Sequence, residues 1–215
     1  MRSKFDEQLA LMKNELIQMG ALCEEAISLA AKSLNEGNKA LAEKAMALDT
    51  EINQMERDIE TLCLKLLLQQ QPVARDLRQI SAALKIITDM ERIGDQAADI
   101  AEIVLAMLTE GYVPEDVGNI WEMAAEAIKM VTESVDSYVR QDMDQAREVI
   151  EHDDIVDAYF IRVRTVLIQK ITVNPADGEC ALDLLMIDKY LERIGDHATN
   201  IAEWVLFSVT GKKEP

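Results

Sequence analysis

The sequence predicts an all-α fold made of two tandem, pseudo-repeated three-helix bundles with six long helices. Glycine (8) and proline (4) are scarce among the 215 residues, and helix-forming aliphatic and charged residues dominate. Apolar residues recur every three or four positions through almost the whole chain, which is the period of an amphipathic helix. A distinctive segment of the first half also recurs in the second half.

The predicted helices follow one another with short connections. Each proline falls between helices, because proline lacks the backbone N–H that a helix interior needs. A fourth helix is expected to begin at Glu115 or Asp116 and to end near 140. The apolar spacing predicts the other five over residues 3–35, 39–69, 73–109, 142–172 and 177–209.

An internal repeat divides the chain into two halves. Residues 90–102 (MERIGDQAADIAE) match residues 191–203 (LERIGDHATNIAE) at an offset of 101. A pattern of Asn or Asp, Ala, Asp, and Asn or Asp over 38–53 recurs with the same spacing over 142–157. Short loops make neighbouring helices antiparallel, so each half is expected to form a three-helix bundle. The predicted domains are residues 1–112 and 113–215.

The charge of the chain limits the partners that it can bind. Its formal net charge is −18, so nucleic acid and anionic lipid are unfavourable direct partners. Cations and proteins with basic patches remain, and the plain alternative is an acidic surface that only keeps the protein soluble.

The cysteines and the apolar runs indicate a cytoplasmic location. Cys23, Cys63 and Cys180 are odd in number, lie far apart and form no CxxC pair, which fits a reducing compartment and buried thiols. No apolar run reaches the roughly 18–20 residues of a membrane span, and the N-terminus has no apolar signal core. Membrane contact is therefore expected only through partners.

Acidic residues recur every four positions on four of the predicted helices. Side chains at i and i+4 lie on one stripe of a helix, and like charges at that spacing destabilise it slightly. The stripes are Asp49 and Asn53; Glu91, Asp95 and Asp99; Asp153 and Asp157; and Asp188, Glu192, Asp196 and Asn200.

In both halves the stripes are predicted to lie level on adjoining helices. Asp49 and Asn53 lie as far before Pro72 as Glu91 and Asp95 lie after it, and the second half repeats this arrangement about Pro175. Facing carboxylates leave room for a hard or borderline cation, such as magnesium, manganese, iron or zinc. The competing interpretation is that each stripe is solvated surface.

Two further residue pairs flank the acids. His152 and His197 each adjoin a motif acid but point about 100° away, so surface or structural roles are favoured over metal ligation. Gly94 and Gly195 lie in mid-helix, where they allow either close helix approach or space beside an ion.

The segments Glu91-Arg-Ile-Gly-Asp95 and Glu192-Arg-Ile-Gly-Asp196 resemble the PhoU family. The likeness extends over nearly the whole chain and includes the duplicated plan and the stretch Gln70–Arg78. It implies a cytoplasmic negative regulator of phosphate uptake and of the phosphate regulon. The implied partners are the ATPase subunit of the phosphate ABC transporter and a sensor histidine kinase. The resemblance also implies metal clusters and a homodimer.

The resemblance places the metal ligands by matching position. The chain departs from the motif at Asn53 and Asn200, where asparagine offers a carbonyl oxygen but no charge, so the site with Asn53 is expected to bind metal more weakly. The implied ligands are Asp49, Glu91, Asp95, Asp99, Asp153, Asp157, Glu192 and Asp196.

Two other function classes compete with a regulatory adaptor. A carboxylate-bridged metal enzyme would usually carry Glu-x-x-His, but Val149 precedes His152 and Ile194 precedes His197 at that spacing. Phosphate-binding loops and nucleophile motifs are also absent from the sequence, so an enzyme is not expected. A purely structural helical adaptor without metal is the third class.

Overall fold

Six long helices account for almost all of the described chain. The computed structural model describes residues 2–69, 73–112, 115 and 117–212. Pro72, Pro114 and the predicted helix start at Asp116 lie outside the described residues. The helices are α1 (Arg2–Glu36), α2 (Lys39–Gln69), α3 (Ala74–Thr109), α4 (Ile120–Arg140), α5 (Met143–Val173) and α6 (Gly178–Thr210), with a short 3₁₀ helix η1 (Pro175–Asp177) before α6. The predicted all-α fold of six helices is confirmed, and five of the six predicted starts fall within one residue.

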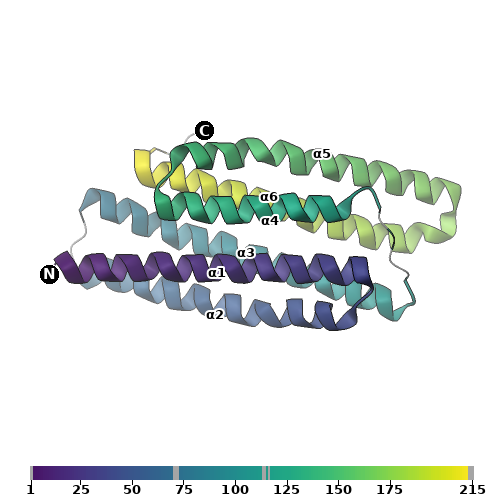
Figure 1. Ribbon diagram of the computed structural model, residues 1–215, viewed down its shortest axis with the longest axis horizontal. Helices are drawn as coiled ribbons and strands as arrows, with labels where there is room; N and C mark the ends of the chain where they lie inside the picture. Colours follow the sequence, from purple (N-terminus) through teal and green to yellow (C-terminus); the bar gives the residue numbers. More distant parts are fainter. Residues whose placement is uncertain (1, 70–72, 113–114, 116, 213–215) are drawn as a thin grey trace.

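Each half forms an antiparallel three-helix bundle, and the halves pack side by side (Figure 1). α3 contacts α6 and α1 contacts α4, so these four helices form the contact between the halves. Among the described residues, α2 and α5 contact only elements of their own half. The C-terminal end of α2 and the C-terminal end of α5 lie at opposite ends of the elongated molecule (Figure 1).

The repeated pattern over 38–53 and 142–157 begins at the start of a helix in both halves. Asn38 Oδ1 accepts a hydrogen bond from the backbone of Ala40, at the start of α2. Asp142 Oδ1 accepts from the backbone of Asp144 and Gln145, at the start of α5. The repeat therefore conserves a helix cap, which satisfies N–H groups that have no partner within the helix.

The fourth helix begins at Ile120, so the predicted start at Glu115 or Asp116 is wrong. Gly118 and Asn119 have φ of 63° and 71°, and such left-handed residues cannot belong to a right-handed helix. Gly118 also lies against the backbone of Val163, where an added Cβ would come within 2.9 Å of Cα. The Gly-Asn pair was the sequence signal for a turn at this point.

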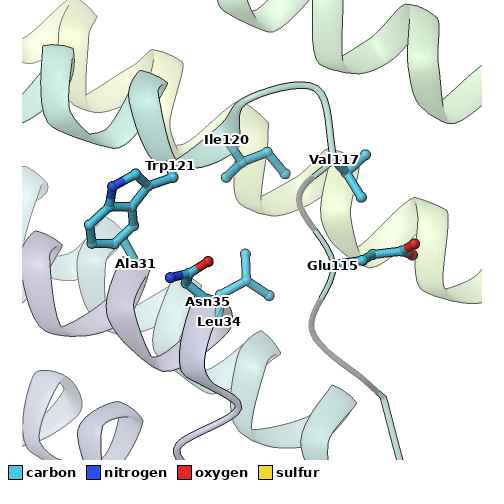
Figure 2. Close-up of a pocket in the computed structure, with 7 residues that line it drawn as sticks. All are labelled: Ala31, Leu34, Asn35, Glu115, Val117, Ile120 and Trp121. Atoms are coloured by element: carbon cyan, nitrogen blue, oxygen red, sulfur yellow. The ribbon is translucent and has the colours of Figure 1, made fainter.

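The connection between the halves is packed against both of them. Val117 and Ile120 are buried, and together with Leu34 and Trp121 they line a small hollow at the end of α1 (Figure 2). Glu115 forms an ion pair with Lys170 of α5. The connection is therefore held at two separate places.

The core is filled by aliphatic and sulfur-containing side chains, as the low aromatic content (4%) predicts. The buried side of α1 shows the three- and four-residue spacing of an amphipathic helix. Its fully buried residues include Met12, Leu16, Met19 and Cys23. Cys63 is buried as well, whereas Cys180 is partly exposed, and all three thiols are free. None of the helices in the described part of the chain combines the length and apolar character that a membrane-spanning helix needs.

Candidate functional site

The structure contains two acid clusters, one in each half. The first acid cluster lies between α2 and α3, and the second lies between α5 and α6, on the pairs of helices that the sequence predicted. We define the first acid cluster as Asp49, Asn53, Glu91, Asp95 and Asp99, and the second as Asp153, Asp157, Glu192 and Asp196.

Asp49 faces the acids of α3 in the first acid cluster. Burial raises the pKa of Asp49, and the negative charges of Asp95 and Asp99 raise it further. Asn53 opposes this rise, since its Nδ2 donates a hydrogen bond to Asp49 Oδ2 at 2.9 Å. Asp49 Oδ1 is buried without a hydrogen-bond partner in the described part of the chain. The structure therefore brings these carboxylates together across the hairpin.

Glu91 completes the first acid cluster on α3. Burial raises its pKa, as do the nearby charges of Asp95, Glu56 and Asp49, while the Arg92 guanidinium opposes the rise. Arg92 lies 2.9 Å from Asp95 and 3.4 Å from Glu91 in exposed ion pairs. Arg92 thus pairs with two acids at the surface and neutralises part of the charge of this cluster.

The second acid cluster carries more uncompensated charge. Burial raises the pKa of Asp153 to about 6, and the charges of Asp157 and Asp196 contribute to the rise. The pKa of Asp196 is raised by burial and by Glu192, and this effect is opposed by Lys189. Lys189 forms an ion pair with Glu192 and lies 5.4 Å from the centre of the Phe160 ring. Lys189 and, at Asp196, His197 therefore partly balance the four acids.

Asp188 belongs to the same stripe of α6 but was not among the predicted ligands. It is fully buried, and neither of its carboxylate oxygens has a hydrogen-bond partner among the described residues. Burial raises its pKa to about 8, the charge of Glu192 adds to the rise, and Lys189 opposes it. The i, i+4 spacing from Asp188 to Glu192 was the sequence signal, but periodicity alone did not reveal that Asp188 points inward.

Asp99 and Asn200, at the ends of their stripes, lie at the contact between α3 and α6. Asn200 Nδ2 donates to Asp89 Oδ1 at 3.3 Å, and His197 Nδ1 lies 2.8 Å from the same oxygen. The hydroxyl of Tyr190 lies beside Asp99 and lowers its pKa, against the larger effect of burial. Asp89 matches Tyr190 and Asp99 matches Asn200 at the repeat offset, so the two interactions are related by the pseudo-symmetry of the halves.

Both histidines pair with acids of other helices. His197 contacts Asp89 of α3, and His152 Nε2 lies 2.7 Å from Glu126 Oε2 of α4. The side chains thus turn away from the adjoining motif acids, as the i+1 geometry predicted. Sequence reasoning missed Asp89 and Glu126, because their partners come from distant parts of the chain.

The two mid-helix glycines have different neighbours. A Cβ on Gly94 would lie 2.9 Å from Ile52 Cδ1, so this glycine allows close approach of α2 and α3. A Cβ on Gly195 would lie 3.3 Å from Asp153 Oδ1 and from Val156 Cγ1. Gly195 therefore allows close approach of α5 and α6 beside the Asp153 carboxylate, and the alternative of space beside an ion stays a prediction.

The donors of both clusters suit a hard cation, because they are carboxylates whose crowding disfavours their ionised form. The unpartnered Oδ1 of Asp49 has the same chemical preference. In the described residues, however, no three His, Cys, Asp or Glu side chains are arranged closely enough to hold a metal ion. Metal binding, and the assignment of its ligands, therefore stays a prediction.

The fold and the acid clusters define a class of protein: a helical domain present twice, with the same acidic motif on the corresponding helices of each half. A sequence model described as the PhoU domain matches residues 16–104 and 120–205, one match in each half. The chain therefore belongs to the PhoU family. The predicted boundary at 112/113 lies between the two matches and stays a prediction.

Curated relatives and solved structures agree with this membership. A protein of Clostridium acetobutylicum named phosphate-specific transport system accessory protein PhoU homolog is 35% identical, over 99% of this chain and 97% of its own length. A relative of the same name from Synechocystis is 36% identical over 99% and 94%. The crystal structure of PhoU from Pseudomonas aeruginosa superposes with a TM-score of 0.91 at 34% identity, covering 97% of this chain and 100% of that chain. For the phosphate transport system regulatory protein PhoU from Streptococcus pneumoniae the TM-score is 0.88 at 27% identity, covering 98% and 99%.

Proposed function

We propose that this protein is a cytoplasmic negative regulator of phosphate uptake and of the phosphate regulon, acting without catalysis of its own. It would connect the ATPase subunit of the phosphate ABC transporter with a sensor histidine kinase. Its contribution would be to bind one conformational state of each partner better than the other, which shifts their equilibria.

The observation that carries this proposal is family membership over both halves of the chain. The relatives from Clostridium and Synechocystis match over nearly their whole length and are named accessory proteins of the phosphate-specific transport system, not enzymes. The acid clusters add a physical reason, since acidic helical faces attract basic protein surfaces and speed correct encounters. A homodimer would present each face twice.

A cation in the second acid cluster is part of the proposal. Asp153, Asp157, Glu192 and Asp196 would hold it, after side-chain rotations that bring them together, and magnesium, manganese, iron and zinc all accept carboxylate oxygens. The ion would neutralise charge that Lys189 leaves uncompensated. Its role would be structural or regulatory, because the clusters lack the Glu-x-x-His pattern of carboxylate-bridged enzymes.

Co-purification tests the regulatory role. The tagged wild-type chain is expected to retain the transporter ATPase subunit and the sensor kinase from membranes, with different yields at high and low phosphate. A variant of the exposed residue Asp154, Asp154→Asn, serves as a matched surface control and should behave like the wild type. Failure of both partners to bind, with and without added metal, would reject the role.

Elemental analysis tests the cation. Replacing Asp153 and Asp157 by Ala should remove the metal of the second half, while circular dichroism shows an unchanged helix content. Retention of the full metal content by this double variant would contradict the ligand assignment.

A further inference from the structure

The outer side of α5 differs from the matching side of α2 in charge and carries exposed apolar residues. We define the α5 outer face as Ile161, Arg162, Arg164 and Ile168. We propose that this face docks a protein surface in which acidic side chains surround apolar ones. The inference rests on the proposed function, because the docked surface would belong to one of the two regulated partners.

The charge of this part of α5 has reversed relative to its repeat. Residues 158–173 contain three basic residues and no acid, whereas the matching residues 54–69 contain three acids and two basic residues. At the repeat offset of 104, Arg162 matches Asp58 and Arg164 matches Glu60. In a chain of net charge −18, sixteen consecutive residues without an acid form a basic island. The duplication thus gave the two halves the same backbone but opposite charge at this place.

The side chains of the α5 outer face are available to a partner. Ile161 is 58% exposed and Ile168 is 56% exposed, and these residues lie two helical turns apart on the same side of α5. Arg162 and Arg164 are exposed and have no ion-pair partner within the part of the chain that the structure describes. A partner can bind such a face in two ways at once, because its acidic side chains pair with the arginines and its apolar side chains pack against the isoleucines.

The fold leaves this end of α5 accessible. α4 has 21 residues and α5 has 31, so the α5/α6 hairpin continues past the start of α4 (Figure 1). The connection between the halves packs on a different side of α5, where Glu115 pairs with Lys170 and Gly118 contacts Val163. Leu182 of α6 is 60% exposed and lies as far after Pro175 as Ile168 lies before it, so it stands level with Ile168 on the adjoining helix.

The charge and composition of the α5 outer face favour an acidic protein as its partner over a second copy of the chain or a membrane. A symmetric contact of this face with the same face of a second copy would bring the arginine pairs of the two copies close together, which like-charge repulsion opposes. Insertion into a membrane surface usually relies on aromatic side chains as well as aliphatic ones, and the α5 outer face has none.

The sharpest test gives the second half the residues of the first. The double variant Arg162→Asp with Arg164→Glu carries side chains that the fold already accepts at the matching positions Asp58 and Glu60. Its affinity for the purified ATPase subunit or sensor kinase that binds the wild type should fall about tenfold or more, with the larger change at low salt. The reciprocal variant, Asp58→Arg with Glu60→Arg, should change the affinity by less than about twofold.

A second matched pair tests the apolar contact. Ile168→Asp should weaken binding by about tenfold or more, whereas Leu64→Asp, at the matching and also exposed position of α2, should not. Urea unfolding and circular dichroism of each variant should stay at wild-type values, because all of these side chains are exposed.

The possible outcomes separate this inference from the proposed function. Wild-type binding that is unchanged in Arg162→Asp/Arg164→Glu overturns the docking face and leaves the regulatory role intact. Absence of wild-type binding to both partners overturns both. Wild-type binding to vesicles of phosphatidylglycerol and phosphatidylethanolamine that is lost in the double variant would replace the acidic protein by a membrane. A wild-type dimer that dissociates in the double variant would replace it by a second copy.

Discussion

The two acid clusters occupy equivalent places in the two halves and hold four acids each, yet a further buried acid, Asp188, lies beside the second cluster only. Asp157 stands where the first half has Asn53, and the buried Asp188 stands where the first half has the buried Ile87. The first cluster has an internal amide donor to Asp49 and a guanidinium beside its acids. The second relies on Lys189 for its cationic partner.

This difference shows that the duplication preserves the helical framework more strictly than the charge placed on it. Helix caps, helix order and mid-helix glycines recur in both halves, because the packing of long helices depends on them. The polar side chains between the helices have changed, and the second half now holds acids that are locally unfavourable in the metal-free protein. Residues moved from one half into the other test how much this difference matters for stability and binding.

The largest effect is expected from Asp188→Ile, which introduces the first-half residue. The raised pKa of Asp188 means that the native state keeps a proton between an ordinary pKa of 3.8 and about 8, where the unfolded state has lost it. The free energy of unfolding of the wild type should therefore fall as the pH rises through this range. We expect the variant to be more stable by about 2–3 kcal/mol at pH 8 and by clearly less at pH 4.

Urea unfolding of metal-free protein at the two pH values measures this difference. The exposed Asp154→Asn should shift the free energy of unfolding by less than about 0.5 kcal/mol at either pH. A pH-independent gain for Asp188→Ile would show that Asp188 is not a source of the pH dependence.

The glycines give the next largest difference between the halves. Gly94→Ala places a Cβ against Ile52 Cδ1 and should destabilise the protein by about 1–2 kcal/mol, even after the better helix propensity of alanine is included. Gly195→Ala meets Val156 and Asp153 at 3.3 Å and should change stability by less than about 1 kcal/mol. Thermal unfolding of both variants checks the order.

Ile52 and Val156 are equivalent residues, and the extra carbon of Ile52 makes the shortest contact at Gly94, 2.9 Å from Cδ1, while Cγ2 of Ile52 follows at 3.0 Å. The double variant Ile52→Val with Gly94→Ala should recover part of the stability lost in Gly94→Ala, because only the contact with Cδ1 is removed. Additive losses in the double variant would contradict this explanation.

The sequence predicted the helices, the repeat and the pairing of α2 with α3 and of α5 with α6, because these depend on periodicity and on short connections. It placed Asp49 opposite Asp95 by counting from Pro72, since straight antiparallel helices keep level residues adjacent. It could not give the contact between the halves, where Asp89 meets His197 and Asn200. That contact joins residues more than a hundred positions apart, and no local pattern fixes how two amphipathic bundles dock.

The sequence also could not show which acids point inward. Asp188 and Asp196 share one stripe, yet Asp188 is fully buried and Asp196 is exposed. The stripe drifts around the helix by about 40° per i, i+4 step, so two steps move a side chain from the core to the surface. The start of α4 was missed for a related reason, because the acids at 115 and 116 resemble a helix start while Gly118 and Asn119 prevent one.

The smallest effect is expected from exchanging Asn53 of the first acid cluster and its equivalent in the second, Asp157. Asn53→Asp removes the amide that donates to Asp49 and adds a fifth acid to the first acid cluster. The metal-free variant should lose about 0.2–0.5 kcal/mol of stability, because like charges four residues apart on a helix repel.

The affinity of the first half for Mn²⁺ should rise about threefold to fivefold, since an ionised ligand replaces a neutral one. Asp157→Asn should lower the affinity of the second half by a similar factor. Isothermal titration of both variants with Mn²⁺ measures the exchange. Equal affinities in the wild type and in both variants would show that the acid clusters differ in charge without differing as cation sites, and the asymmetry would then lie only in stability and in the α5 outer face.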